Sequence, residues 1–247
     1  MPSESGDQKV LSNFRKLIDF VAADPNYNPA NARIKVAGLE TLYTSGQTVA
    51  TNVRTTEAPY KVAVNTRQAK FAEAAPRAGS AIRMAQASGA GKAIIDDLRT
   101  HSRKLSGQRK SKAPKIDPND PTKEDGTGNK THSTSQLSYD NQIGHIENIV
   151  ALLSNIPTYA PNEEELKITS LQAFVAELKA VNDAVNTNFV PFSQARGARD
   201  EVLYTGEDSV INIALLVKAY VSAAFGTQSP LYKSIKGLEF PRQGKTA

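Results

Sequence analysis

Few residues in this chain have the types and the spacing that chemistry requires. The segment 87–93 resembles a phosphate-binding loop, with Gly91 followed by Lys92. The full pattern needs a glycine where Gln86 stands and a serine or threonine where Ala93 stands, and it must follow a strand. We therefore interpret this glycine-rich segment as the end of a helix rather than as a nucleotide site.

Acidic residues and histidines suggest no clearer site. The glutamates at 163–165 are consecutive, so on a helix they point in different directions and are better placed to stabilise a helix N-terminus than to bind a metal. The three histidines, at positions 101, 132 and 145, are too far apart for a local ligand motif, and the chain has no cysteine. We expect no catalytic residue, no cofactor and no metal site.

A basic segment is the one local feature that suggests a ligand. Residues 99–115 contain no acid and seven basic side chains, which are Arg99, Arg103, Lys104, Arg109, Lys110, Lys112 and Lys115. Such a segment is either a solvated linker or a binder of nucleic-acid phosphates that ignores base sequence. It has no aromatic residue to stack on bases, so we prefer the linker and keep nucleic-acid binding as the alternative.

The strongest pattern in the chain is an internal repeat. Residues 25–67 align without a gap to residues 157–199, which lie 132 positions later, with 11 identities in 43 positions. Unrelated sequence would give about 3 at average residue frequencies. The identical pairs include Tyr27 with Tyr159, Lys35 with Lys167, and Arg67 with Arg199. We interpret these pairs as structural, with side chains that tie helices together or pack a loop over a bundle end; the alternative is that they line equivalent binding sites.

Apolar residues spaced three or four apart predict helices in both repeats. In the first repeat we expect helices over about 8–23, 29–56, 60–74 and 76–88, with a short one over 93–105. In the second we expect helices over about 139–154, 161–190, 191–204 and 207–225, with a short one over 230–236. The boundaries rest largely on prolines, which lack the N–H that a helix interior needs, and on a helix cap at Asn28.

The expected fold is therefore all-α, with two tandem homologous antiparallel helical-bundle units, each of four main helices plus a short fifth. The units cover residues 1–106 and 139–237, joined by a flexible, disordered basic and polar linker over 107–138, and 238–247 form a tail. The two units either form separate bundles or pack side by side about a pseudo-twofold axis. The chain start lacks the hydrophobic region of a secretion signal, and no apolar run approaches the length of a membrane span, so we expect a soluble cytoplasmic protein.

Two segments resemble a known group of proteins. They are 137–166, which begins LSYDNQI and ends YAPNEEEL, and 217–237, which reads VKAYVSAAFG and then SPLYKSIKG. Both are similar to a group of uncharacterised, duplicated all-helical bacterial proteins. The resemblance implies an all-helical fold and a bacterial cytoplasmic origin. That group has no assigned activity, so no functional residue is carried over.

From these observations we expect a non-enzymatic structural or interaction protein that assembles with itself or with another protein through its helical faces. Duplication favours this role, because two similar faces on one chain resemble those of a homodimer. The alternative is sequence-independent nucleic-acid binding through residues 99–115.

Overall fold

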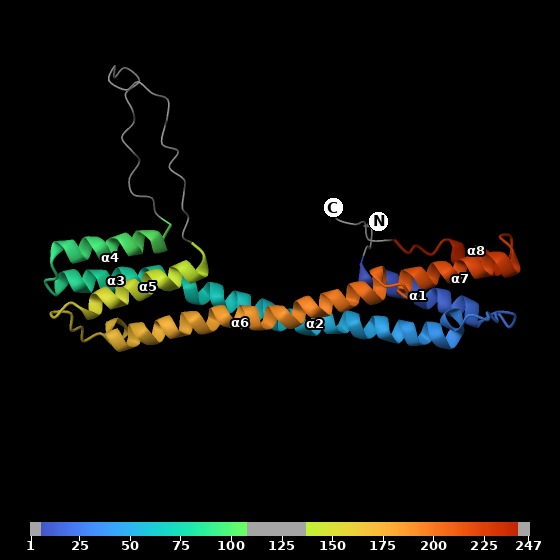
Figure 1. Cartoon of the computed structure of the whole chain (residues 1–247), viewed down its shortest axis with the longest axis horizontal. Coiled ribbons are helices and arrows are strands. Elements are labelled where there is room, and N and C mark those ends of the chain that lie inside the picture. Colours follow the sequence, from blue (N-terminus) through green and yellow to red (C-terminus); the bar gives the residue numbers. More distant parts are fainter. Residues whose placement is uncertain (1–5, 108–136, 242–247) are drawn as a thin grey trace, which may run out of the picture. The chain divides into compact units, whose positions relative to one another are not determined.

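The computed structural model of the 247-residue chain describes residues 6–107 and 137–241 (Figure 1). Within these ranges the chain forms helices and no strand. The all-α fold predicted from the sequence is therefore confirmed for the described residues. All but a few residues of the predicted linker and tail lie outside the described ranges.

The helices of the first half of the chain are α1 (Asp7–Ala22), the 3-10 helix η1 (Ala32–Ile34), α2 (Val36–Ala72), α3 (Ala74–Ala87) and α4 (Lys92–Leu105). Those of the second half are α5 (Tyr139–Ser154), the 3-10 helix η2 (Glu164–Leu166), α6 (Ile168–Asp200), the π-helical turn η3 (Glu201–Thr205), α7 (Val210–Phe225) and α8 (Pro230–Lys236). Three pairs of elements, α1 and α5, η1 and η2, and α2 and α6, begin 132 residues apart. This is the spacing of the sequence repeat.

Helices α2 and α6 are longer than predicted. Pro59 and Pro191 lie inside them, although the prediction ended a helix at each proline. A proline removes one backbone hydrogen bond, and at Pro59 an ion pair between Glu57 and Lys61 (2.7 Å) spans the affected turn. The predicted plan of four main helices and a short fifth is therefore corrected, because two pairs of predicted helices are single helices of 37 and 33 residues.

Helix α2 also begins later than predicted. The expected cap at Asn28 is wrong, because the side-chain oxygen of Asn31 accepts a hydrogen bond from the Arg33 N–H (3.0 Å) and caps η1 instead. The α-helix itself starts only at Val36. Likewise, the glutamates at 163–165 lie at η2 rather than in the first turn of α6.

The helices form two compact units, each assembled from both halves of the chain. Unit 1 comprises Met1–Lys61 and Thr187–Ala247, and unit 2 comprises Val62–Asn186. Neither unit coincides with the predicted spans 1–106 and 139–237. The difference arises because α2 and α6 each contribute one end to unit 1 and the other end to unit 2.

In unit 1, helices α1, α7 and α8 pack together beside the first part of α2 (Figure 1). Gly46 of α2 lies so near α1 that an added Cβ would meet Leu11 Cδ2 at 2.7 Å, so glycine permits the close approach of these two helices. Tyr27 packs edge-on against Tyr220 of α7, with ring centroids 5.4 Å apart. The largest fully buried side chains of this core are Phe14, Leu17, Ile18, Leu39, Leu203, Ile211 and Ile213.

In unit 2, helices α3, α4 and α5 pack together beside the first part of α6 (Figure 1). Helix α3 contributes mainly small side chains to this core, namely Ala74, Ala78, Ala81 and Ala85. Small residues let neighbouring helices approach closely. The largest fully buried side chains of this core are Phe174, Leu98, Ile149, Leu153 and Leu178.

Candidate functional site

Two histidines meet between helices α4 and α5 of unit 2. The Nδ1 atoms of His101 and His145 are 3.4 Å apart, and their ring planes are inclined by 52°. His145 is buried, with 8% of its surface exposed, and His101 is partly buried. No local motif could reveal this pair, because its members are 44 residues apart and only the packing of two helices joins them. The third histidine, His132, lies outside the described residues.

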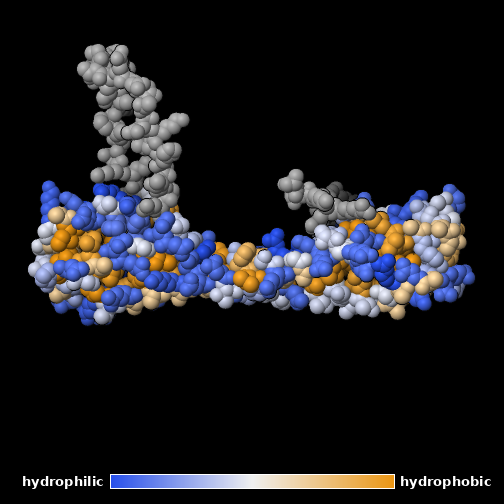
Figure 2. All heavy atoms as spheres, viewed as in Figure 1, coloured by the Kyte–Doolittle hydropathy of each residue, from blue (hydrophilic) through white to orange (hydrophobic). Residues whose placement is uncertain are grey.

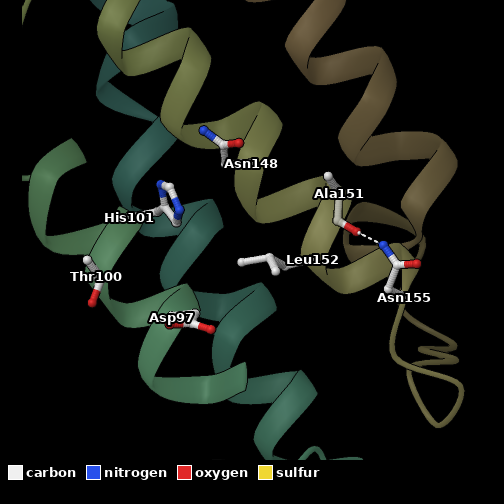
Figure 3. Close-up of a pocket in the computed structure, with 7 residues that line it drawn as sticks. All are labelled: Asp97, Thr100, His101, Asn148, Ala151, Leu152 and Asn155. Carbon is white, nitrogen blue, oxygen red and sulfur yellow. Dashed lines mark hydrogen bonds between the residues drawn. The ribbon is translucent and has the colours of Figure 1, made fainter. Parts of the chain in front are cut away.

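A cavity of about 310 Å³ lies beside His101 (Figure 3). It is lined by Asp97, Thr100 and His101 from α4 and by Asn148, Ala151, Leu152 and Asn155 from α5 and its C-terminal cap. The Thr100 hydroxyl donates to the Asp96 carbonyl and accepts from Arg103 Nη2, both at 2.9 Å. This hydroxyl is therefore engaged within its own helix and is not poised as a nucleophile.

Burial lowers the pKa of both imidazoles, and the charge of Lys104 lowers the pKa of each further. Asp97 partly opposes this effect at His101. The lowered pKa values favour the neutral rings, and the two Nδ1 atoms lie within hydrogen-bond distance, with the donor set by the tautomers. The buried Nε2 of His145 finds no hydrogen-bond partner among the described residues, and the described ranges hold no group of three His, Cys, Asp or Glu able to bind a metal. Protonation of either ring would place a positive charge in this contact between α4 and α5.

The repeat-equivalent tyrosines make the same hydrogen bond. The Tyr27 hydroxyl donates to the Ile34 carbonyl at 2.6 Å, and the Tyr159 hydroxyl donates to the Leu166 carbonyl at 2.7 Å. Burial raises the pKa of Tyr159 to about 12 and also raises the pKa of Tyr27. Each tyrosine fastens the loop that precedes a long helix, which favours the structural interpretation of this pair.

The repeat-equivalent arginines each contact the start of a helix from the other half of the chain. Arg199, at the end of α6, donates from Nη1 to the carboxylate of Asp7 (3.2 Å), the first residue of α1. Arg67 of α2 donates to the side chain of Asn182 (3.1 Å), and its guanidinium lies 4.0 Å from the ring centroid of Tyr139, the first residue of α5. Since Asp7 and Tyr139 are themselves 132 positions apart, the two arginines occupy equivalent places.

Lys35 and Lys167 have an equivalent interaction through their backbone carbonyls rather than through their side chains. Each follows a 3-10 helix, and its carbonyl accepts the first hydrogen bond of a long helix, from the N–H of Leu39 (3.0 Å) or of Leu171 (2.9 Å). The Lys167 ammonium pairs with Glu164 at 2.5 Å on the exposed surface.

Three of the seven predicted nucleic-acid contacts lie on α4, namely Arg99, Arg103 and Lys104. Arg99 donates to Gln86 (3.1 Å) and pairs with Asp96 (3.7 Å), and Arg103 donates to Thr100. These guanidinium groups therefore have partners within unit 2. The other four, Arg109, Lys110, Lys112 and Lys115, lie outside the described residues.

Unit 1 exposes apolar side chains on α6. Phe189 is 45% exposed and Val190 is 54% exposed. The apolar spacing of the predicted helix over 161–190 extends to Phe189 and predicts a core position for it, and that prediction is wrong. The rings of Phe189 and Phe192 both contact Tyr60 of α2, with centroids 5.6 and 5.4 Å apart. We call Tyr60, Phe189, Val190 and Phe192 the aromatic cluster. Figure 2 shows apolar surface over this stretch of the two long helices.

The helical stretch Ile168–Phe225 contains an 18-residue window that is apolar enough to span a membrane by length and composition, and 39% of that window is buried in the structure. Helix α7, which ends this stretch, contributes six residues to the core of unit 1. Its lysine, Lys218, donates to the carbonyls of Leu238 (2.5 Å) and Lys236 (3.2 Å), and burial lowers its pKa.

Comparison of the chain with protein-family models, with curated proteins and with solved structures gave no match. The resemblance to duplicated helical bacterial proteins therefore stays a prediction. The candidate sites rest on the geometry of this chain alone.

Proposed function

We propose that this is a non-enzymatic assembly protein, which associates with a second copy of itself through the aromatic cluster of unit 1. The exposure of this cluster is the observation that carries the proposal. Aromatic residues and arginine are enriched at the centres of protein interfaces. Both types are present here, since the guanidinium of Arg196 lies 5.7 Å from the centroid of the Phe192 ring.

The magnitudes favour a weak, concentration-dependent association. Complete burial of a phenylalanine or valine side chain contributes about 1.5–3 kcal/mol. Phe189 and Val190 are about half exposed, so a twofold contact between two copies gains roughly 3–6 kcal/mol from these residues. This gain lies at the low end of the estimated cost of association, about 4–15 kcal/mol, so Tyr60 and Phe192 must also contribute for the dimer to form.

Light scattering coupled to size-exclusion chromatography, over a series of protein concentrations, tests this proposal. We expect the parent mass to rise with concentration, and we expect the double variant Phe189→Ser, Val190→Ser to remain a monomer. Leu215→Ser is the matched control, because Leu215 is 37% exposed on α7 and lies outside the cluster. A parent that stays monomeric at high concentration, or a double variant that associates as well as the parent, contradicts the proposal.

We further propose that the chain arose by duplication of one helical unit, with parts exchanged between the copies. The matched starts of α1 and α5, the matched tyrosine hydrogen bonds and the matched arginine contacts support this origin. Each compact unit then combines the opening helices of one repeat with the closing helices of the other. This arrangement is the intramolecular counterpart of a domain-swapped homodimer, and it fits a protein whose surfaces serve assembly.

Nucleic-acid binding through residues 99–115 is a second candidate. The observation that favours it is the basic end of α4, where Arg103 and Lys104 lie in the last turn of the helix. A titration of a labelled duplex at two salt concentrations tests it, with Arg103, Lys104, Arg109, Lys110 and Lys112 changed to Ser as the variant. If about five of these side chains neutralise phosphates, the affinity should fall roughly as the fourth or fifth power of salt concentration. Equal binding by parent and variant rules this candidate out.

A further inference from the structure

A cavity of about 570 Å³ lies between α1 and α2 of unit 1. Its lining includes Leu11 of α1 and Ala50 of α2, which are buried and give it an apolar floor. The close approach of the two helices at Gly46 fixes this floor. The volume falls within the range of small-molecule sites, roughly 300–1,000 Å³.

Three of the lining side chains are cationic and none is acidic. Arg15 is already engaged, because its guanidinium bonds Glu40 (2.7 Å) and Asp19 (2.5 Å), and these bonds raise its pKa. Lys16 has no ion pair with any described residue, and Arg54 donates only from Nε, to a carbonyl one turn earlier in α2. The cavity wall therefore holds two positive charges that no described carboxylate neutralises, one on each helix.

Neutral donors complete the lining. The Tyr43 hydroxyl accepts a hydrogen bond from Gln47 Nε2 (2.9 Å), so its own proton remains available to a ligand. The hydroxyl groups of Ser12 and Thr51 lie on the walls from α1 and α2. A group with several negatively charged oxygens matches this combination, because hydrogen bonds from cationic donors to such oxygens are among the strongest in proteins.

A second cavity, of about 210 Å³, lies between α5 and α6 of unit 2. It is lined by Asp140, Ile143, Lys179, Asn182 and Asp183, each of which stands 132 positions after a residue that lines the first cavity. This second cavity contains two carboxylates, and the positions equivalent to Lys16 and Arg54 hold the uncharged residues Asn148 and Asn186. Since equivalent helix pairs pack with either set of charges, packing does not require the cations of unit 1.

We propose that the cavity between α1 and α2 binds a small phosphorylated molecule, with Lys16 and Arg54 contacting its phosphate oxygens. A phosphate dianion neutralises both cations at once, and its remaining oxygens accept hydrogen bonds from Tyr43 and the wall hydroxyls. The apolar floor accommodates the rest of a small ligand. Unit 1 is thereby a ligand-binding unit. The one cation that lines the cavity of unit 2, Lys179, pairs with Glu147 at 2.6 Å and lies beside two carboxylates, so that cavity does not suit a phosphate.

The test is the thermal unfolding midpoint of the full chain with increasing inorganic pyrophosphate, at ionic strength held constant with chloride. A ligand that binds the native state raises the midpoint in a saturable way. We expect Lys16→Ser, Arg54→Ser to weaken the pyrophosphate affinity at least about tenfold, the change that loss of one strong charged contact produces. The matched control is Lys61→Ser, Arg83→Ser, which removes two exposed cations outside the cavity and should respond like the parent.

A second arm replaces pyrophosphate with a short duplex oligonucleotide and identifies the source of the phosphate. Stabilisation by pyrophosphate that needs Lys16 and Arg54 supports a small ligand. Stabilisation by the duplex alone, or an equal response of the cavity variant and the control, overturns the proposal. So does the absence of any shift in the parent. Circular dichroism of each variant without ligand shows whether it is folded, and a single variant, Arg54→Gln, replaces the double variant if the double variant is not folded.

Discussion

Replacing Arg199 by alanine should lower the free energy of unfolding by about 2 kcal/mol. Its side chain is 17% exposed, and it bonds both Asp200 (2.6 Å) and Asp7 (3.2 Å), whose side chain is 26% exposed. A hydrogen bond to a charged group contributes about 1.5–3 kcal/mol when buried. The Asp7 bond is long and both groups retain some solvent, so the lower end of that range applies. In the variant, Asp7 still accepts a hydrogen bond from the Tyr204 hydroxyl (2.7 Å), which limits the loss of stability.

Urea denaturation followed by far-ultraviolet circular dichroism measures this effect. Arg83→Ala is the matched control, because Arg83 is an exposed arginine on α3, and it should change stability by less than about 0.5 kcal/mol. A double-mutant cycle with Asp7→Asn should show a coupling energy of about 1 kcal/mol between two residues 192 positions apart. If Arg199→Ala costs no more than the control, or if the cycle shows no coupling, the contact between α6 and α1 is not formed in solution.

Acid should weaken unit 2 through His101 and His145. The pKa values of both imidazoles in the folded protein lie below the ordinary value of 6.5. Their contribution to the free energy of unfolding is therefore fully present above pH 6.5, and it is lost as the pH falls through the folded pKa values. A pH series of urea denaturation should show this loss, and His145→Leu should flatten it; an unchanged slope would refute the assignment. Tyr27→Phe and Tyr159→Phe should each cost about 1 kcal/mol, because each removes the same hydrogen bond. Strongly unequal losses in the same denaturation assay would argue against equivalent roles for the two tyrosines.

The separate helices were predictable where local signals agree. Helices α1 and α5 begin and end within a residue of prediction, because an apolar stripe with 3–4 spacing runs between clear breaks. The extents of α2 and α6 were not predictable from local signals. A proline removes one backbone hydrogen bond, and the remaining contacts of each long helix outweigh the loss of that bond. The proline does destabilise the helix, but its energetic cost is smaller than the stabilisation that packing of the long helix provides.

The partners of the helices were not predictable for a different reason. Periodicity tells which face of α1 is buried, and not what covers it. Residues 25–67 and 157–199 share an aligned apolar pattern, so that pattern does not decide whether α1 is covered by helices of its own half of the chain or of the other half. The structure packs α1 against α7 and α4 against α5, which are pairings between the two halves.

The candidate sites depend on those pairings. His101 and His145 come from α4 and α5, and the basic cavity combines Lys16 of α1 with Arg54 of α2. Each of these residues is unremarkable within its own helix, since a single charge or imidazole is typical of a solvated helix face. The aromatic cluster was hidden by the helical pattern, which assigned Phe189 to a core that the folded chain completes without it.

Each compact unit is assembled from both halves of the chain, and a single cut between the halves tests this assembly directly. A protease site inserted between residues 107 and 137 allows cleavage of the folded protein, and light scattering then gives the mass of the products. If the units are assembled as described, the two fragments remain associated at the mass of the uncut chain, 26.6 kDa per copy, and separate only in denaturant. If the fragments separate under native conditions as two folded monomers of about half that mass, each half folds by itself, and the assembly of each unit from both halves is ruled out.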